Sequence, residues 1–285
     1  MSSLCIKTNN EEVLSYLQNE FSSFNMLNTF YSRKEFKHYK NIIIHYTGID
    51  KELFYTKLAT ILSYLVIDYF EPNIIKNILN ANYFYFENTE FNKILDLCEE
   101  NLCEDDEFSF QDRQLALFDI FYEYISSNNT IILTGFINFR LADYRKILEE
   151  LVDFSVNEFI IEREYLEFIS LLRLYVNSQP SSNMEVHAIS FNDEILLLDE
   201  NMNQIPIDKK ALNAKYLSDV SFSNNDYILN TLLNLLPQKI HLHLVQPSCN
   251  PDFINTLQLV FEKRIKICHN CNICNLYKKL SIKNN

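Results

Sequence analysis

Glycine is nearly absent from this chain of 285 residues, which contains only Gly48 and Gly135. Average usage of ~7% would give about 20 glycines. Loops that bring backbone N–H groups against phosphates need several glycines within a few residues. The sequence therefore excludes Walker-type, Rossmann-type and kinase-type nucleotide sites. We expect Gly135 to supply a backbone conformation that other residues avoid, at the entry to a helix.

Basic residues are also scarce, because 25 Lys and Arg stand against 38 Asp and Glu and leave a formal charge of −13. A protein that binds nucleic acid usually presents a basic face to the phosphates. We therefore expect no nucleic-acid partner, apart from a contact at one local basic patch. That patch surrounds the C-terminal cysteines and comprises Lys263, Arg264, Lys266, Lys278, Lys279 and Lys283.

Long apolar runs are missing as well. The longest, Leu58–Phe70, is interrupted by Asp68 and is shorter than the roughly 20 residues of a membrane span. The N-terminal residues Met1–Lys7 contain no apolar segment of the secretory type. We expect a cytoplasmic protein without membrane contact. Its seven cysteines should then be reduced or metal-bound.

A hydrophobic content of 47% is enough for a sizeable core. The patterning predicts an α+β fold with a small N-terminal α/β unit over residues 1–50 and a mostly helical domain over 51–180. A C-terminal α/β domain over 183–285 ends in the cysteine cluster. The main boundary is predicted at residues 177–183, where small polar residues surround a proline.

Helical spacing dominates the first two parts. Asn10 is expected to cap a helix, and the β-branched run Asn41–Tyr46 predicts a strand. Lys51–Phe70 is an apolar helix, and Pro72 begins the next one. Residues 136–179 contain neither glycine nor proline, which predicts one long amphipathic helix or a helix pair.

The period changes after residue 183. Glu185–Phe191 and Glu194–Leu198 predict a hairpin, and Asp226–Leu236 predicts a helix. Next come a strand at Lys239–Val245, a helix from Pro251 to about residue 263, and a short strand at Arg264–Ile267. We expect the two strands to lie parallel, joined by a right-handed crossover.

Three cysteines near the C-terminus, Cys268, Cys271 and Cys274, are each separated by two residues. If the two strands are parallel, Cys249 follows the first strand at the same edge of the sheet where Cys268 follows the second. Cys249 also lies near a helix N-terminus, where the helix dipole favours the thiolate. The sequence therefore predicts a metal site at Cys249, Cys268, Cys271 and Cys274. Such a set suits zinc or an iron–sulfur cluster.

Other interpretations of these cysteines stay open. They can form a thiol redox switch, or they can be inert residues in a tail. His269 is a spare candidate ligand, although its neighbour Cys268 makes simultaneous ligation awkward.

His241 and His243 lie on one face of their predicted strand and can ligate a catalytic zinc, with His187 or Asp252 as the third ligand. Histidines on a half-exposed strand are nevertheless ordinary. The acidic run at residues 99–107 lacks the spacing of a calcium loop. No hydrolase elbow or HExxH motif occurs, so no catalytic residue is assigned.

A second distinctive stretch runs from Gly135 to Gln179. It comprises Gly135–Leu141, Asp143-Tyr144, Val152-Asp153, Val156–Phe159, Glu164–Ile169, Leu171-Leu172 and Gln179. This stretch resembles the YtxC-type sporulation proteins of endospore-forming bacteria. The resemblance implies a cytoplasmic protein associated with spore formation, and it implies no activity, cofactor or catalytic residue.

Three hypotheses for the function result. The first is a non-catalytic accessory protein that acts in sporulation through protein partners, with its oligomeric state left open. The second is a zinc- or iron–sulfur-binding regulator that uses the four cysteines. The third is a metal-dependent hydrolase that uses His241 and His243.

Overall fold

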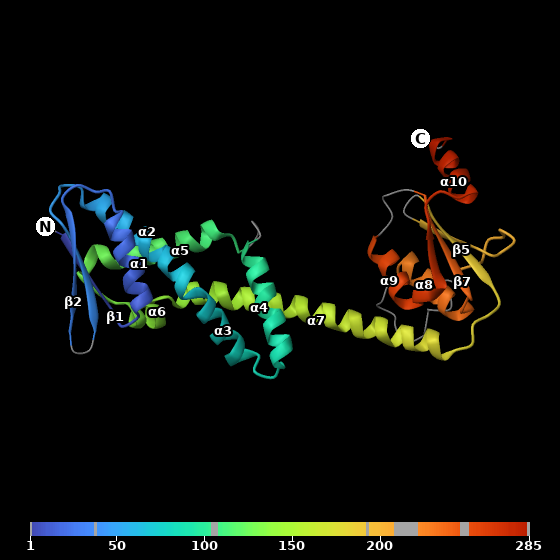
Figure 1. Ribbon diagram of the computed structural model, residues 1–285, viewed down its shortest axis with the longest axis horizontal. Coiled ribbons are helices and arrows are strands. Elements are labelled where there is room, and N and C mark those ends of the chain that lie inside the picture. The colour runs from blue at the N-terminus through green and yellow to red at the C-terminus, as the bar shows by residue number, and fades with distance from the viewer. Residues whose placement is uncertain are drawn as a thin grey trace. The chain divides into compact units, whose positions relative to one another are not determined.

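The computed structural model describes residues 2–36, 39–103, 108–191, 194–207, 222–245 and 251–283. The chain has two compact units, Met1–Ile161 and Glu162–Asn285. Many helices accompany two four-stranded sheets, which confirms the predicted α+β class (Figure 1). The division into units lies inside helix α7 (Ala142–Ser178), whereas the predicted linker at residues 177–183 begins near the end of that helix.

The first unit contains one sheet with the strand order β2-β3-β1-β4. β1 pairs antiparallel with β3 and parallel with β4, and β2 pairs antiparallel with β3. Burial alternates along β1, so one face of the sheet is packed against the helices. The elements are β1 (Ser2–Thr8), α1 (Glu11–Ser22), β2 (Thr29–Glu35), β3 (Lys40–Tyr46), α2 (Lys51–Tyr69), α3 (Glu71–Asn82), α4 (Asn88–Cys103), α5 (Phe110–Ser127), β4 (Thr130–Ile132), α6 (Leu133–Arg140) and the first part of α7.

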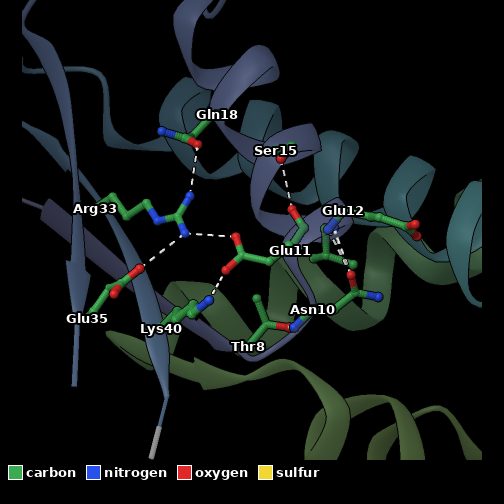
Figure 2. A network of polar contacts seen from close by, with 10 residues as sticks. Thr8, Asn10, Glu11, Glu12, Ser15, Gln18, Arg33, Glu35 and Lys40 are labelled. Carbon is green, nitrogen blue, oxygen red and sulfur yellow. Dashed lines mark hydrogen bonds and ion pairs between the residues drawn. The ribbon is translucent and has the colours of Figure 1, made fainter. Parts of the chain in front are cut away.

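Helix α1 is fixed to this sheet at its N-terminus, as Figure 2 shows. The side chain of Asn10 accepts hydrogen bonds from the backbone N–H groups of Glu12 and Val13, which confirms the predicted cap. Glu11 forms ion pairs with Arg33 of β2 and Lys40 of β3. The first turn therefore contacts two strands through charged groups.

One hydrophobic core runs through the described part of the first unit. It extends from Leu4 in β1 to Phe159 in α7 and includes the apolar faces of α2 and α5. The predicted N-terminal α/β unit and the predicted helical segment therefore share this core. Pro72 lies in the first turn of α3, as expected.

A buried ion pair crosses this core. The guanidinium of Arg113 in α5 donates to the carboxylate of Glu71 in α3, and both side chains are only 4% exposed. The hydroxyl of Tyr144 in α7 donates a hydrogen bond to the same carboxylate, and Arg113 Nε donates to the carbonyl oxygen of Phe108 at 3.0 Å. Three helices are thus linked by one polar network inside an apolar core.

Gly135 lies within α6 and has no positive φ angle, so the expected special backbone conformation is wrong. An added Cβ there would approach nothing closer than 3.9 Å. Gly48 is different, because a Cβ at that position would overlap the ring of Tyr46. That ring is fixed by stacking on Phe54 at 5.1 Å.

No single helix among the described residues is long and apolar enough to cross a membrane. The bent pair α2 and α3 passes the same length and composition test when its two helices are taken together. Residues of both helices are buried in the core of the first unit.

The second unit contains a sheet with the strand order β6-β5-β7-β8. β5 and β6 form the predicted antiparallel hairpin, and β5, β7 and β8 run parallel, as expected for the strands on either side of the predicted crossover. Its elements after α7 are β5 (Glu185–Phe191), β6 (Glu194–Leu198), α8 (Asn224–Leu235), β7 (Lys239–Leu244), α9 (Pro251–Phe261), the 3-10 turn η1 (Glu262–Arg264), β8 (Ile265–Cys268) and α10 (Asn272–Lys283).

The two faces of this second sheet are covered differently. Val186, Ala188, Ile240 and Leu242 form one core with residues of α7, α8 and α9. On the other face, Ile189, Leu198 and Val245 form a small cluster that Ile273 and Tyr277 of α10 join. Figure 1 shows α10 as the last element of the unit. The segment that the sequence suggested as a tail is therefore a helix that covers part of the sheet.

Candidate metal centre

The three C-terminal cysteines lie together with one histidine of the sheet. Cys268 ends β8, Cys271 precedes α10 and Cys274 lies in the first turn of α10. His243 in β7 is the register partner of Cys268 in the parallel β7–β8 pair. The Nδ1 atom of His243 and the three Sγ atoms all lie within 4.8 Å of one another. We call these four residues the His–Cys group.

Helix α10 explains why Cys271 and Cys274 are close. The Sγ atom of Cys271 accepts a hydrogen bond from the backbone N–H of Cys274 at 3.5 Å, as a capping side chain does. The spacing of two intervening residues therefore places both sulfurs at the N-terminal end of the helix. The partial positive charge at that end stabilises thiolates.

Four of the six separations within the His–Cys group match those around one tetrahedral ion, and the other two are at most 4.8 Å. With Zn–S bonds of about 2.3 Å and a Zn–N bond of about 2.0 Å, a tetrahedron has S···S edges of ~3.8 Å and N···S edges of ~3.5 Å. The Sγ atom of Cys274 lies 3.7 Å from that of Cys271 and 3.8 Å from that of Cys268. Nδ1 of His243 lies 3.3 Å from Cys271 Sγ and 3.4 Å from Cys274 Sγ.

The electrostatics of the group also suit a cation. Burial, followed by the neighbouring imidazoles of His187 and His241, lowers the pKa of His243 to about 4. His243 is therefore neutral near pH 7, which is the form that binds metals.

The two cysteines of α10 are shifted in opposite directions. Burial raises the pKa of Cys274 to about 11. Burial also acts on Cys271, but hydrogen bonds from the Cys274 N–H and from the thiols of Cys268 and Cys274 lower its pKa. Cys271 therefore ionises before Cys274, and a bound cation would supply the positive charge that ionises the remaining thiols.

Two further histidines share this face of the sheet. His187 in β5 is the register partner of His241 in β7, and their ring centroids are 4.9 Å apart. His241 Nε2 lies 3.0 Å from the carboxylate of Glu185. The predicted pair His241 and His243 is thus divided, because His241 contacts Glu185 while His243 contacts the cysteines.

The remaining candidates have other positions. Cys249 lies outside the described residues, as do residues 104–107 of the acidic run. The backbone carbonyl of His269 accepts a hydrogen bond from Lys278 Nζ at 3.1 Å. Arg264 Nη2 donates to the carbonyl of Val176 at 2.8 Å, so two members of the basic patch bind backbone oxygens of this chain.

The sequence alone predicts His243 at a different site from the cysteines. The strand period predicted its face of the sheet, and the crossover predicted that its strand runs parallel to that of Cys268. The missing information was the register, which aligns His243 with Cys268 and not with the residue before or after it.

Comparison with known proteins gives one family. A family model described as the YtxC-like family matches residues 56–266. An uncharacterized protein, YtxC, from Bacillus subtilis (strain 168) is 23% identical over 204 residues, which cover 69% of this chain and 71% of that protein. No solved structure matches the chain significantly.

Proposed function

Because the chain belongs to the YtxC-like family, we propose that it is an accessory protein of sporulation that binds other proteins in the cytoplasm and catalyses no reaction. We further propose that one Zn²⁺ ion, bound by His243, Cys268, Cys271 and Cys274, stabilises the second unit. The observation that carries the zinc proposal is the convergence of the four ligand atoms, which lie within 4.8 Å of one another and of which four separations match the edges of a tetrahedron.

A single ion suits this spacing better than an iron–sulfur cluster does. In a cluster, the thiolates are distributed over two or more iron atoms that bridging sulfides separate. Thiolates on different iron atoms then lie farther apart than the edges of one tetrahedron. Three thiolates and one imidazole are also a common ligand set of structural zinc.

The number of ligands favours a structural role over a catalytic one. Catalytic zinc keeps a coordination position open for water or substrate, whereas structural zinc is closed by four protein ligands. The His–Cys group supplies four. The lack of glycine-rich nucleotide loops and of hydrolase motifs in the sequence agrees with a protein that works by binding.

Zinc analysis of matched variants tests the metal proposal. His243→Ala and Cys271→Ser should lose bound zinc, whereas Cys103→Ser, which replaces an exposed thiol of the first unit, should retain it. The zinc content of Cys249→Ser shows whether Cys249, the fourth ligand predicted from the sequence, also binds the ion. Retention of zinc by His243→Ala would refute the ligand set, and iron with sulfide in the purified chain would favour a cluster.

Sporulation assays test the biological part. In the bacterium that encodes the chain, deletion of the gene should lower the yield of heat-resistant spores without slowing vegetative growth. Crosslinking in sporulating cells should recover the same partner proteins with the natural chain and with Cys103→Ser. An unchanged spore yield together with no reproducible partner would refute the accessory role.

A further inference from the structure

His187 contacts the outer edge of the imidazole of His243. Its Nδ1 atom lies 2.9 Å from His243 Nε2, which is a hydrogen-bond distance. The ring centroids are 5.2 Å apart, about as far as two imidazoles joined by a nitrogen–nitrogen contact of 2.9 Å can be, so the hydrogen bond lies close to the plane of both rings. The opposite nitrogen of His243, Nδ1, lies against the cysteine sulfurs.

We propose that His187 is a positioning residue that accepts a hydrogen bond from the Nε2–H of His243 and so presents His243 Nδ1 to the zinc ion. The inference rests on the proposed zinc site. A neutral imidazole has one protonated and one unprotonated nitrogen, and only the unprotonated nitrogen binds a metal. An acceptor at Nε2 holds the proton there and leaves the Nδ1 lone pair free for the ion.

The arrangement also assigns the proton of His187. Because its Nδ1 accepts the hydrogen bond, His187 carries its own proton on Nε2. The ring of His187 lies beside His241, and Glu185 holds His241 by a contact of 3.0 Å. The acceptor of the His243 hydrogen bond is thus His187 in β5, whereas His241 contacts Glu185.

An imidazole acceptor suits the charge of this site. Three thiolates and one Zn²⁺ carry a net charge of −1, and His243 is only 3% exposed. A carboxylate acceptor, which is common next to zinc-bound histidine, would add a second negative charge beside a buried group. A neutral histidine fixes the same tautomer without that cost.

Zinc affinity of the full chain, measured by chelator competition, tests the role of His187. His187→Leu should weaken zinc binding by about 10- to 100-fold, because the leucine side chain cannot accept the hydrogen bond from His243 Nε2–H. His187→Asn should retain most of the affinity, since its Oδ1 can accept the hydrogen bond from about the position of Nδ1. His241→Leu is the matched control, because it removes a neighbouring imidazole on the same face and leaves the acceptor in place.

A second measurement avoids substitutions. Long-range ¹H–¹⁵N spectra of the zinc-loaded natural chain should show His243 protonated at Nε2 and metal-bound at Nδ1, with His187 protonated at Nε2. The opposite tautomer of either ring would overturn the proposal. Equal zinc affinity of His187→Leu and the natural chain would overturn it too, as would equal weakening of His187→Leu and His187→Asn.

These results distinguish the inference from the function on which it rests. A natural chain that binds zinc tightly together with an unaffected His187→Leu variant removes only the positioning role. A natural chain that binds no zinc removes both.

Discussion

Replacement of Arg113 by methionine should destabilise the first unit by about 3–5 kcal/mol. Arg113 and Glu71 are each 4% exposed, so neither charge is stabilised by water. Without the guanidinium, the Glu71 carboxylate keeps the hydroxyl of Tyr144 as a partner and loses its counter-charge. The carbonyl oxygen of Phe108, which accepts from Arg113 Nε at 3.0 Å, also loses this donor.

A double variant separates the ion pair from simple packing. Glu71→Leu with Arg113→Met removes both charges, so no uncompensated charge stays in the core. We expect it to be more stable than Arg113→Met alone by at least ~1 kcal/mol, a measurable coupling between two contacting residues. Arg145→Met is the control, because its ion pair with Glu149 at 3.3 Å is exposed and should contribute less than about 0.5 kcal/mol.

Hydrogen exchange of the full chain, read by mass spectrometry on peptides from α3 and α5, reports the stability of this unit without interference from the second one. Arg113→Met should exchange these amides faster by about two to four orders of magnitude, which corresponds to the free energy above. Protection equal to that of Arg145→Met would refute the argument. A double variant whose loss of stability equals the sum of the losses of Glu71→Leu and Arg113→Met would also refute it.

Three further outcomes are expected. Gly48→Ala should destabilise the chain by about 1–3 kcal/mol in urea unfolding, because the added Cβ would overlap the stacked Tyr46 ring. Gly135→Ala places its Cβ in open space within α6 and should be neutral or stabilising by up to about 1 kcal/mol. Equal changes in stability for the two variants would contradict this expectation. Chelation of the metal should abolish exchange protection in α10, since a helix of 12 residues is marginal alone, while β5 and β7 stay protected. The metal-free chain should lose stability as the pH falls from about 6.5 towards 4. The pKa of His243 is lowered to about 4 in the fold, so protonation in this range favours the unfolded chain. A stability that does not change with pH, or the same slope in His243→Asn, would contradict the assignment to His243.

Local patterns predicted many of the elements. The cap at Asn10, the proline at the start of α3 and the alternation along β5 and β7 depend on neighbouring residues, and the structure confirms each. The sequence left open whether residues 136–179 form one helix or two. In the structure, α6 ends at Arg140 and α7 then continues to Ser178.

Non-local pairing limited the prediction. β1 was not predicted, although it lies between β3 and β4 in the first sheet. Its partner β4 has only three residues, too few to show a period, and is distant in the chain, so the parallel pair has no local signal. The metal centre shows the same limit, because the cysteines were visible in the sequence while the alignment of His243 with Cys268 depends on strand register.

The most direct test of the zinc centre is the amount of zinc, iron and sulfide per chain in protein purified without oxygen, together with its visible absorption spectrum. We expect close to one zinc per chain, no visible colour, and loss of that zinc in His243→Ala but not in Cys103→Ser. A folded natural chain without zinc, or one that contains iron and sulfide and absorbs visible light, would contradict it.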